Sequence, residues 1–361
     1  MKKILFYIAQ DYYWTSMEPI YREFEKEGGY TLHLQVGKNS RRLFGLFLLS
    51  GRSRLERKYR EQGFEVTQNT MGYDAVFCGA PIKKPDRYGD ALLCNVDHGP
   101  GIKTLRYRHF LAQPDIHYIC FIEGPYRAEK FRKYGLDKIE EIVDVGLPKL
   151  DVFFDGTYDR DELVQKYELD PAKKIVLYAP SYKPTSMFDI GETIVRLSDR
   201  YNIVVKLHPY SWSGKYASHA QHRLFEGLKK TYPGFFLVPP SEHNIMPFMF
   251  IADTMISDGS SVINEFLALE RCGIIYNMED DSMKHGDGQL LLEDKSSEWL
   301  RDSFIHIDAV DQLPEAVETA LNPSEERLNH IKKDKASIFS HTDGQSARRV
   351  KDSVIELLNK R

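Results

Sequence analysis

The stretch ISDGSSVINEFLALERCGIIY, residues 256–276, predicts a strand, a turn, a helix and a second strand. The turn at residues 258–261, Asp-Gly-Ser-Ser, has cap chemistry, and VINEFLALE carries apolar residues at helical spacing. Free N–H groups and the positive dipole end of the first helical turn attract an anion. Gly259 lets the backbone come close, Ser260 and Ser261 add hydroxyls, and Glu265 lies where a carboxylate would accept ribose hydroxyls. We therefore predict a nucleotide site here, although an ordinary capped helix has the same pattern.

Length and composition indicate a soluble two-domain protein. The 361 residues are too many for one ordinary core and fit domains of about 150 to 180 residues. A net charge of −4 gives no basic field for nucleic acid. The four cysteines are widely spaced, which favours reduced core thiols in a cytosolic protein. The opening MKKILFYIAQD is too short in its apolar run for a signal peptide and predicts the first strand, and no stretch approaches the roughly 20 apolar residues of a membrane span.

Short apolar runs alternate with helical patterns, which is typical of parallel-sheet α/β units. Expected strands in the first half are residues 3–9, 30–36, 64–68, 74–80, 91–97, 116–122 and 140–146. After a pause near residue 150, expected strands follow at 173–180, 201–209, 235–240, 253–259 and 273–277. We predict an α/β domain at 1–160, a second at 161–340, and a C-terminal amphipathic helix at 341–361 with Val350, Val354, Leu357 and Leu358 on one face.

Polar side chains of catalytic type follow four of the expected strands. They are His98 after 91–97, Ser181 and Lys183 after 173–180, Lys206 and His208 at the end of 201–209, and the Gly-Ser-Ser turn after 253–259. Two parallel sheets that face one another would form a cleft at these carboxyl ends, where ligands of such sheets bind. A histidine between a buried strand and Gly or Pro is held firmly with its ring free for acid–base work. Each residue by itself also suits a structural role.

Several motifs carry a family resemblance. DHGPGIK, VGLPKLD, YAPSYK, KLHP and ISDGSSVINEFLAL occur in the order and spacing of the CDP-glycerol glycerophosphotransferase family, the teichoic acid primases and polymerases. DGQSARRV near the C-terminus is similar too, and the match covers roughly residues 92–350. The resemblance implies a glycosyltransferase-B-type fold, in which two Rossmann-like α/β domains face a central cleft. It also implies a CDP-alcohol such as CDP-glycerol as donor, no tightly bound cofactor, and a lipid-linked saccharide acceptor at the cytoplasmic face of a bacterial membrane.

The resemblance further implies that His98 and His208 are the catalytic pair and that Ser260 and Ser261 hold the donor phosphates. We place the other candidate donor-side residues at Lys103, Ser181, Lys183, Lys206, Gly259 and Glu265. In phosphoryl transfer an acceptor hydroxyl attacks the phosphorus and CMP leaves, so the site must align both and absorb charge. His98 is the candidate base, with His208 and Lys103 neutralising the diphosphate, and the reverse assignment of the histidines stays open.

No metal cluster is expected. His219 and His222 suit a polar helix face, and the acidic run at 279–281 suits a solvated loop. Three other functions share these features: a glycosyltransferase using a nucleotide sugar, an isomerase similar to UDP-N-acetylglucosamine 2-epimerases, and a nucleotide-binding scaffold without turnover. Glycerol, ribitol or a sugar could be the donated group, and a chain of this length favours a primase over a polymerase.

Residues 38–60 suggest contact with a membrane surface. The sequence KNSRRLFGLFLLSGRSRLERKYR has eight basic residues and one acidic residue, which flank the apolar run from Leu43 to Leu49. The run is too short to span a bilayer, but it suits a segment lying in the interface against anionic headgroups. A helix packed on the first domain, with its arginines in water, is the alternative. We therefore expect a cytoplasmic protein that is peripheral on the inner face of the cell membrane.

Overall fold

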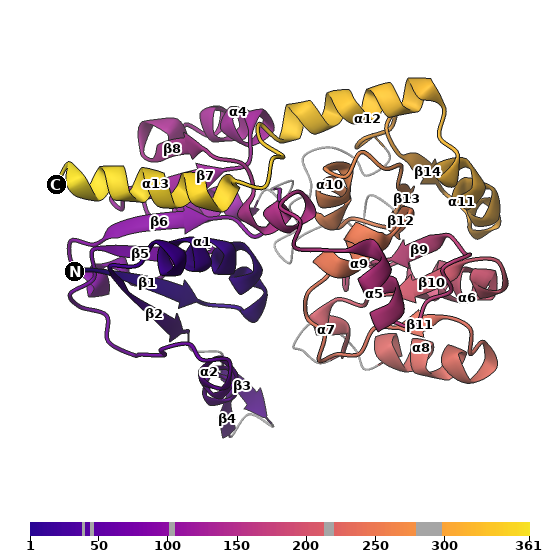
Figure 1. Ribbon diagram of the computed structural model, residues 1–361, viewed down its shortest axis with the longest axis horizontal. Coiled ribbons are helices and arrows are strands. Elements are labelled where there is room, and N and C mark those ends of the chain that lie inside the picture. The colour runs from indigo at the N-terminus through magenta and orange to yellow at the C-terminus, as the bar shows by residue number, and fades with distance from the viewer. Residues whose placement is uncertain (38–39, 44–46, 101–104, 213–219, 279–297) are drawn as a thin grey trace. The chain divides into compact units, whose positions relative to one another are not determined.

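The structure is a computed structural model that describes residues 1–361 except 38–39, 44–46, 101–104, 213–219 and 279–297. The described residues form two compact units (Figure 1). The first extends to Asp155 and resumes at Ile338–Arg361, and the second is Gly156–Ser337. The expected boundaries at residues 160 and 340 lie close to these. The C-terminal helix, however, belongs to the first unit and not to a segment of its own.

The first unit is built on a six-stranded sheet in the order β2-β1-β5-β6-β7-β8. Its strands are β1 (Lys2–Ile8), β2 (Tyr30–Val36), β5 (Ala75–Cys78), β6 (Leu92–Val96), β7 (Ile119–Ile122) and β8 (Glu141–Asp144). Every neighbouring pair is parallel. The strand order reverses between β1 and β5, so the carboxyl ends of those two strands flank the switch point of the sheet.

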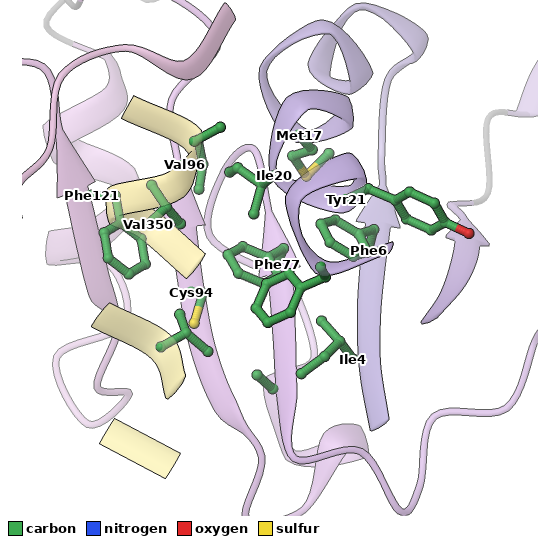
Figure 2. Close-up of a cluster of buried hydrophobic side chains, with 14 of the residues drawn as sticks. Ile4, Phe6, Met17, Ile20, Tyr21, Phe77, Cys94, Val96, Phe121 and Val350 are labelled. Carbon is green, nitrogen blue, oxygen red and sulfur yellow. The ribbon is translucent and has the colours of Figure 1, made fainter. Parts of the chain in front are cut away.

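Helices cover both faces of this sheet, and the alternation of side chains along the strands explains why. Ile4 and Phe6 face a core completed by α1 (Trp14–Glu27) and α13 (Ser346–Asn359), where Phe6 stacks on Phe77 at 4.9 Å between ring centroids (Figure 2). Leu5 faces the opposite core with α3 (Leu105–Leu111) and α4 (Pro125–Lys133). Val350 of α13 lies in the first core, which confirms the predicted apolar face of the C-terminal helix.

A buried carboxylate fixes the start of that helix. Asp151, in the 3-10 turn η4 (Pro148–Phe153), accepts backbone hydrogen bonds from Ser346 at 3.0 Å and Ala347 at 2.8 Å. Burial raises the pKa of Asp151 to about 6. Just before the helix, the chain passes over Gly124, where an added Cβ would lie 2.4 Å from the Ile338 carbonyl oxygen. Glycine is therefore required at the end of β7 for the C-terminal segment to return to the first unit.

The second unit has its own six-stranded sheet in the order β11-β10-β9-β12-β13-β14. Its strands are β9 (Ile175–Tyr178), β10 (Asn202–Val205), β11 (Phe236–Leu237), β12 (Thr254–Ser257), β13 (Ile274–Tyr276) and β14 (Ile305–Ile307). All neighbouring pairs are parallel. Every residue of β9, β10 and β12 is buried, as expected for parallel strands covered on both faces. The switch point lies between β9 and β12.

The helices of the second unit precede, connect and follow these strands (Figure 1). They are α5 (Arg160–Lys166), α6 (Met187–Arg196), α7 (Pro209–Trp212), α8 (Ala220–Thr231), α9 (Met246–Ile251), α10 (Val262–Leu267), α11 (Leu313–Leu321) and α12 (Glu325–Ile338). The segment after the pause near residue 150 contains α5, so it is partly helical and belongs from Gly156 on to the second unit. All four cysteines are buried and form no disulfide, as predicted.

Two parts of the first unit differ from the expectation. Residues 64–68 form no strand, because Val66 makes only an isolated parallel bridge to Leu34 before the chain diverges. In the segment 38–60, the described residues form the antiparallel strands β3 (Ser40–Leu43) and β4 (Phe47–Ser50), followed by α2 (Arg52–Glu61), so the helix considered as an alternative is found only in the basic part of the segment (Figure 1). Tyr59 anchors α2 in the core and donates to Asp11 at 2.6 Å.

Candidate functional site

The predicted strand-end residues lie where the sequence places them. His98 follows β6 in the first unit, and in the second unit Ser181 follows β9, His208 follows β10, and the turn at 258–261 follows β12. Because β9 and β12 flank the switch point, Ser181 and the turn share the position at which open α/β sheets bind ligands. The structure therefore brings the second-unit candidates together at one sheet edge, and it describes His98 in a separate setting within the first unit.

His98 is joined to a buried cluster of charges. Its Nδ1 lies 3.2 Å from Oδ1 of Asp97, and its backbone N–H donates to the same oxygen at 2.7 Å. Oδ2 of Asp97 pairs with Nη2 of Arg127 at 2.8 Å, and Nε of Arg127 donates to Glu123 at 3.1 Å. Asp97 is 5% exposed, and Arg127 and Glu123 are each 1% exposed. Such deep burial of three charges requires mutual pairing, which this cluster supplies.

Two cations also hold the loop that carries His98. Lys149 donates to the His98 carbonyl at 2.9 Å, and Arg127 donates to the Gly99 carbonyl at 2.9 Å. Burial opposes the charge of Arg127, but Asp97 and Glu123 outweigh it and raise the pKa of the guanidinium further. Burial raises the pKa of Glu123, although Arg127 acts against the shift. The histidine thus sits on a loop whose backbone is fixed from both sides.

Aromatic rings enclose His98 on another side. The segment after β1 supplies Tyr12 and Tyr13, whose ring centroids lie 5.1 and 4.8 Å from that of His98. Tyr13 crosses over Gly79 at the end of β5, and an added Cβ there would lie 2.5 Å from the tyrosine ring. The missing side chain at Gly79 therefore lets Tyr13 reach the histidine across the switch point. These contacts join segments far apart in the chain, so the sequence alone does not predict them.

His208 is held by a backbone donor and by rings. Its Nδ1 accepts from the backbone N–H of Tyr210 at 3.1 Å, so the neutral ring carries its proton on Nε2. The ring centroid of Tyr182 lies 4.7 Å away and that of Tyr210 lies 5.2 Å away. Pro209, the first residue of α7, starts the turn that brings the Tyr210 N–H back to the ring. The KLHP sequence therefore orients the ring as well as ending the strand.

Lys206 is a buried cation two residues before His208. It is 7% exposed, and its Nζ donates to the Leu207 carbonyl at 3.4 Å. Burial lowers the pKa of Lys206 to about 8, with a partial offset from Glu242. Among the residues that the structure describes, no carboxylate forms an ion pair with this amine. An anionic ligand would stabilise its charge, which is what a phosphate-binding lysine requires.

Asp258 has a role that the sequence analysis missed. Although it begins the turn, its carboxylate does not cap α10: it accepts from the backbone of Ser181 at 2.7 Å and from the backbone and hydroxyl of Ser186 at 3.0 and 2.9 Å. The residue is fully buried, and burial raises the pKa of its carboxyl against these hydrogen bonds. Asp258 therefore ties the loop after β9 to the turn after β12 and sets both sides of the switch point.

The remaining donor-side candidates differ in their burial and in their hydrogen bonds. Ser261 occupies the N-cap position of α10 but makes no capping bond through its side chain, and Ser260 and Ser261 are half-buried. Glu265 is buried at 1% exposure within α10, and Lys183 is exposed. The hydroxyl of Ser181 donates to the Pro184 carbonyl, so this side chain stabilises its own loop. Lys103 lies outside the described residues.

The candidate metal ligands have other partners or lie outside the described residues. His222 stacks on Trp212 at 5.3 Å and contacts Glu226 at 3.3 Å, which explains it as part of a helix surface. Residues 219 and 279–281 are not among those described. Within the described ranges, no group of three His, Cys, Asp or Glu side chains is arranged to hold a metal ion.

These features define a two-domain Rossmann-like α/β protein with candidate charge-handling residues at the strand ends. The sequence profile of the CDP-glycerol:poly(glycerophosphate) glycerophosphotransferases matches residues 125–356, which is more than half of the chain. The protein therefore belongs to this family, as the motifs predicted.

Characterised relatives in the family act on polyol phosphates. The chain is 22% identical to a teichoic acid poly(ribitol-phosphate) polymerase of Bacillus spizizenii, over 62% of this chain and 34% of the polymerase. It is 25% identical to a teichoic acid ribitol-phosphate primase of the same organism, over 65% of this chain and 57% of the primase. The chain thus spans about a third of the length of the polymerase and just over half of that of the primase.

Solved structures share the fold. The wall teichoic acid polymerase TagF matches with a TM-score of 0.67 at 17% identity, covering 99% of this chain and 89% of that one. UDP-GlcNAc 2-epimerase from Neisseria meningitidis matches with a TM-score of 0.60 at 11% identity over the full length of both chains. At these identities the likeness shows the fold alone, and it confirms the glycosyltransferase-B-type pair of Rossmann-like domains. The expected cleft between the domains stays a prediction.

Proposed function

We propose that this chain transfers glycerol phosphate, or a related polyol phosphate, from a CDP-alcohol to a hydroxyl of a lipid-linked saccharide. The observation that carries the proposal is the state of His208. Because its Nδ1 accepts from the Tyr210 N–H, its Nε2 carries a proton that can be donated to a phosphate oxygen. His208 then suits charge stabilisation, and His98 becomes the candidate for removing the acceptor proton. This assignment favours one of the two arrangements that the sequence leaves open.

The proposed reaction uses each residue once. The acceptor oxygen forms a bond to the phosphorus that carries the polyol, its proton passes to Nε2 of His98, and the bond from that phosphorus to the bridging oxygen breaks. CMP leaves with the bridging oxygen, whose charge is stabilised by Nε2–H of His208 and the ammonium of Lys206. Ser260, Ser261 and Gly259 present the turn at the β9–β12 switch point to the diphosphate, with Glu265 toward the ribose. Lys103, Ser181 and Lys183 complete the proposed donor side. No tightly bound cofactor is needed for this step.

Relatives support the donor class and leave the polyol open. TagF has been crystallised as a histidine variant soaked with CDPG, which supports a CDP-linked donor in this fold. Named relatives include both ribitol-phosphate and glycerol-phosphate enzymes, and both primases and polymerases. We propose single addition, as by a primase. Counting the phosphates added to each acceptor molecule by mass spectrometry tests that choice, since a polymerase would give a ladder of products.

A donor screen tests the proposed reaction. The protein is incubated with a lipid-linked saccharide and, in separate reactions, with CDP-glycerol, CDP-ribitol and several nucleotide sugars, and the released nucleotide is identified by chromatography. We expect CMP from a CDP-alcohol, with the polyol phosphate recovered on the acceptor. Release of a nucleoside diphosphate from a sugar donor would instead identify a glycosyltransferase. Tight CDP binding without any release would identify a scaffold.

We also propose that residues 38–60 hold the protein at an anionic membrane surface on the cytoplasmic side. Within the described ranges, no helix has the length and apolar character needed to cross a bilayer. The helix α2 is anchored by buried Tyr59 and by the pair of Lys58 with Asp11 at 2.9 Å, while Arg54 and Arg57 are exposed. A rigid helix with exposed arginines next to a partly apolar hairpin suits a headgroup layer.

Vesicle binding tests the membrane proposal. We expect co-sedimentation with phosphatidylglycerol vesicles that weakens with salt, because each arginine near an anionic surface contributes about 1 kcal/mol. The double variant Arg54→Gln/Arg57→Gln should bind more weakly. The matched control Arg132→Gln/Lys133→Gln removes the same charge from exposed positions on α4 and should bind as the wild type does. Equal loss in both variants, or no wild-type binding at low salt, would contradict a specific role for α2.

A further inference from the structure

We propose that Asp97 is a positioning residue that makes His98 a proton acceptor. For its effect on turnover the inference rests on the proposed function, in which His98 removes the acceptor proton. The position of the proton on the neutral His98 ring, however, can be measured without any substrate. The two ideas can therefore fail separately.

The geometry places one carboxylate against one ring nitrogen. Nδ1 of His98 is shielded from solvent and lies 3.2 Å from Oδ1 of Asp97, at ion-pair distance but outside regular hydrogen-bond geometry. The same oxygen accepts the backbone N–H of His98 at 2.7 Å, so the carboxylate contacts both the backbone and the ring of the histidine. The side chain of His98 is nevertheless 34% exposed, so the ring is not enclosed on all sides. Nδ1 of the ring contacts Asp97, and another part of the ring is exposed to solvent.

Electrostatics then decides where the proton of the neutral ring resides. If Nδ1 carried a lone pair, that lone pair would face a carboxylate oxygen at ion-pair distance and be repelled. If Nδ1 carries the proton, the N–H dipole points toward the negative charge and is stabilised. The proton therefore belongs on Nδ1, and Nε2 keeps the lone pair that a general base needs. The same contact stabilises the imidazolium after the proton has been accepted.

Asp97 belongs to a set of paired buried charges, which stabilise its carboxylate in the ionised form. Arg127 pairs with its other oxygen, Glu123 pairs with Arg127, and Lys149 donates to the loop carbonyl. These two acids and two bases balance in charge. The rings of Tyr12 and Tyr13 also lie against the imidazole. Asp97 brings a carboxylate into direct contact with the ring.

A purely structural role for Asp97 is the competing explanation, since it also holds Arg127. Glu123 offers a matched comparison because it is also buried and pairs with the same guanidinium. Glu123→Gln and Asp97→Asn each remove one negative charge from the cluster. A structural role predicts similar effects of the two substitutions, and a positioning role predicts that only Asp97→Asn changes the ring.

The chemistry of the asparagine amide sharpens the test. In Asp97→Asn the amide oxygen faces either Arg127 or His98, and both orientations weaken the contact. With the NH₂ group toward His98, the amide donates to Nδ1 and the ring proton moves to Nε2. With the oxygen toward His98, a neutral acceptor replaces the carboxylate and stabilises Nδ1–H less. Arg127 keeps Glu123 and the Gly99 carbonyl as acceptors in both cases.

The experiment is ¹⁵N NMR of histidine-labelled full-length protein at a pH where the ring is neutral, with His98→Gln used to assign the signal. We expect Nδ1–H in the wild type and in Glu123→Gln, and a smaller share of Nδ1–H in Asp97→Asn. With a CDP-alcohol donor, Asp97→Asn should lower kcat at least about 100-fold with little change in donor KM, and Glu123→Gln should cost much less.

Two results would overturn the inference: an Nε2–H ring in the wild type, or a share of Nδ1–H in Asp97→Asn that is unchanged from the wild type. If Asp97→Asn does not fold, as judged by circular dichroism, the wild-type tautomer still decides the point. A changed tautomer with unchanged turnover would uphold the contact between Asp97 and His98. It would show instead that the proposed function assigns the wrong base.

Discussion

The two units present a histidine at the same kind of place but hold it by different chemistry. In the first unit, His98 follows β6 and its ring nitrogen faces the carboxylate of Asp97 within a buried set of charges. In the second, His208 follows β10 and its equivalent nitrogen accepts a backbone N–H from Tyr210. The sheets place both rings at strand ends, but the neighbouring groups decide which nitrogen keeps a proton. Similar folds can therefore supply a proton acceptor on one side of a reaction and a hydrogen-bond donor on the other.

The cations differ in the same way. Arg127 in the first unit is paired with two buried carboxylates, so its charge is balanced by groups of the protein itself. Lys206 in the second unit is also buried, but among the described residues its amine donates only to the Leu207 carbonyl. The first arrangement fixes a loop, and the second is suited to receive an anion. We accordingly assign donor phosphates to the second unit.

The largest expected effect comes from removing either ring. His98→Ala and His208→Ala should each lower turnover at least about 100-fold while the protein stays folded, because each handles charge in the transition state. The two variants should also differ in their affinity for CDP. Calorimetry should show weaker CDP binding for His208→Ala and unchanged CDP binding for His98→Ala. Near-normal turnover in either variant with the true donor would make that histidine structural.

Lys206 should give the next largest effect, and it depends on pH. A diphosphate favours the ammonium form, so wild-type affinity for CDP should fall as the pH rises through the lysine pKa of about 8. Lys206→Met should bind CDP more weakly at pH 7, and its affinity for CDP should no longer fall as the pH rises through about 8. Lys174→Met, at an exposed position paired with Asp253 before β9, is the control and should leave CDP binding unchanged. A wild-type affinity that is flat across this range would remove Lys206 from the donor site.

The same pKa shift predicts the sign of a stability effect. The folded-state pKa of Lys206 lies at about 8, below the ordinary value of 10.5, so the unfolded chain binds more protons between these values. The contribution of Lys206 to the free energy of unfolding should therefore rise with pH across that window. Urea titrations of the wild type and Lys206→Met at several pH values measure the difference.

The turn after β12 should give the smallest of these effects. Ser261→Ala and Glu265→Ala should each weaken CDP binding by about 1 to 3 kcal/mol, as expected for loss of a hydrogen bond to a charged or polar ligand group. Calorimetry with CDP measures this, and thermal unfolding checks that both variants remain folded. If neither variant changes the affinity, the turn is only the connection between β12 and α10.

The sequence predicted the positions of the candidate residues because those positions follow from simple rules. Apolar runs mark the buried parallel strands, and polar residues directly after them, such as His98, Ser181 and His208, must lie at the carboxyl edge. The chemistry of family motifs could then be assigned to them. The fold class was predictable for the same reason, since the strand and helix alternation is strong along most of the chain.

The contacts that set protonation were not predictable from these rules. Asp97 is adjacent to His98, and that adjacency was the available signal, but its pairing with Arg127 depends on how β6 and α4 come together. Asp258 resembled an N-cap in the sequence and instead binds Ser181 and Ser186 across the switch point. A side chain in a cap position can choose between local and distant donors, and only the packing decides.

The described strands within residues 40–50 could not be predicted for a different reason. The apolar run there lacks the alternation of a half-buried strand, so its described hairpin β3–β4 gave no clear pattern. Likewise, the short strand β14 (Ile305–Ile307) has only three residues and a central histidine, too little for a periodic signal. Tertiary pairing with β13 stabilises β14, and the sequence alone does not show that partner.

The most direct test of the account is the proton position on both rings in one ¹⁵N spectrum of the wild-type protein. His98→Gln and His208→Gln assign the two signals, and the measurement is made at a pH where both rings are neutral. We predict Nδ1–H for His98, beside Asp97, and Nε2–H for His208, beside the Tyr210 N–H. The same tautomer on both rings, or the reverse pair, would contradict the division into a proton acceptor and a hydrogen-bond donor.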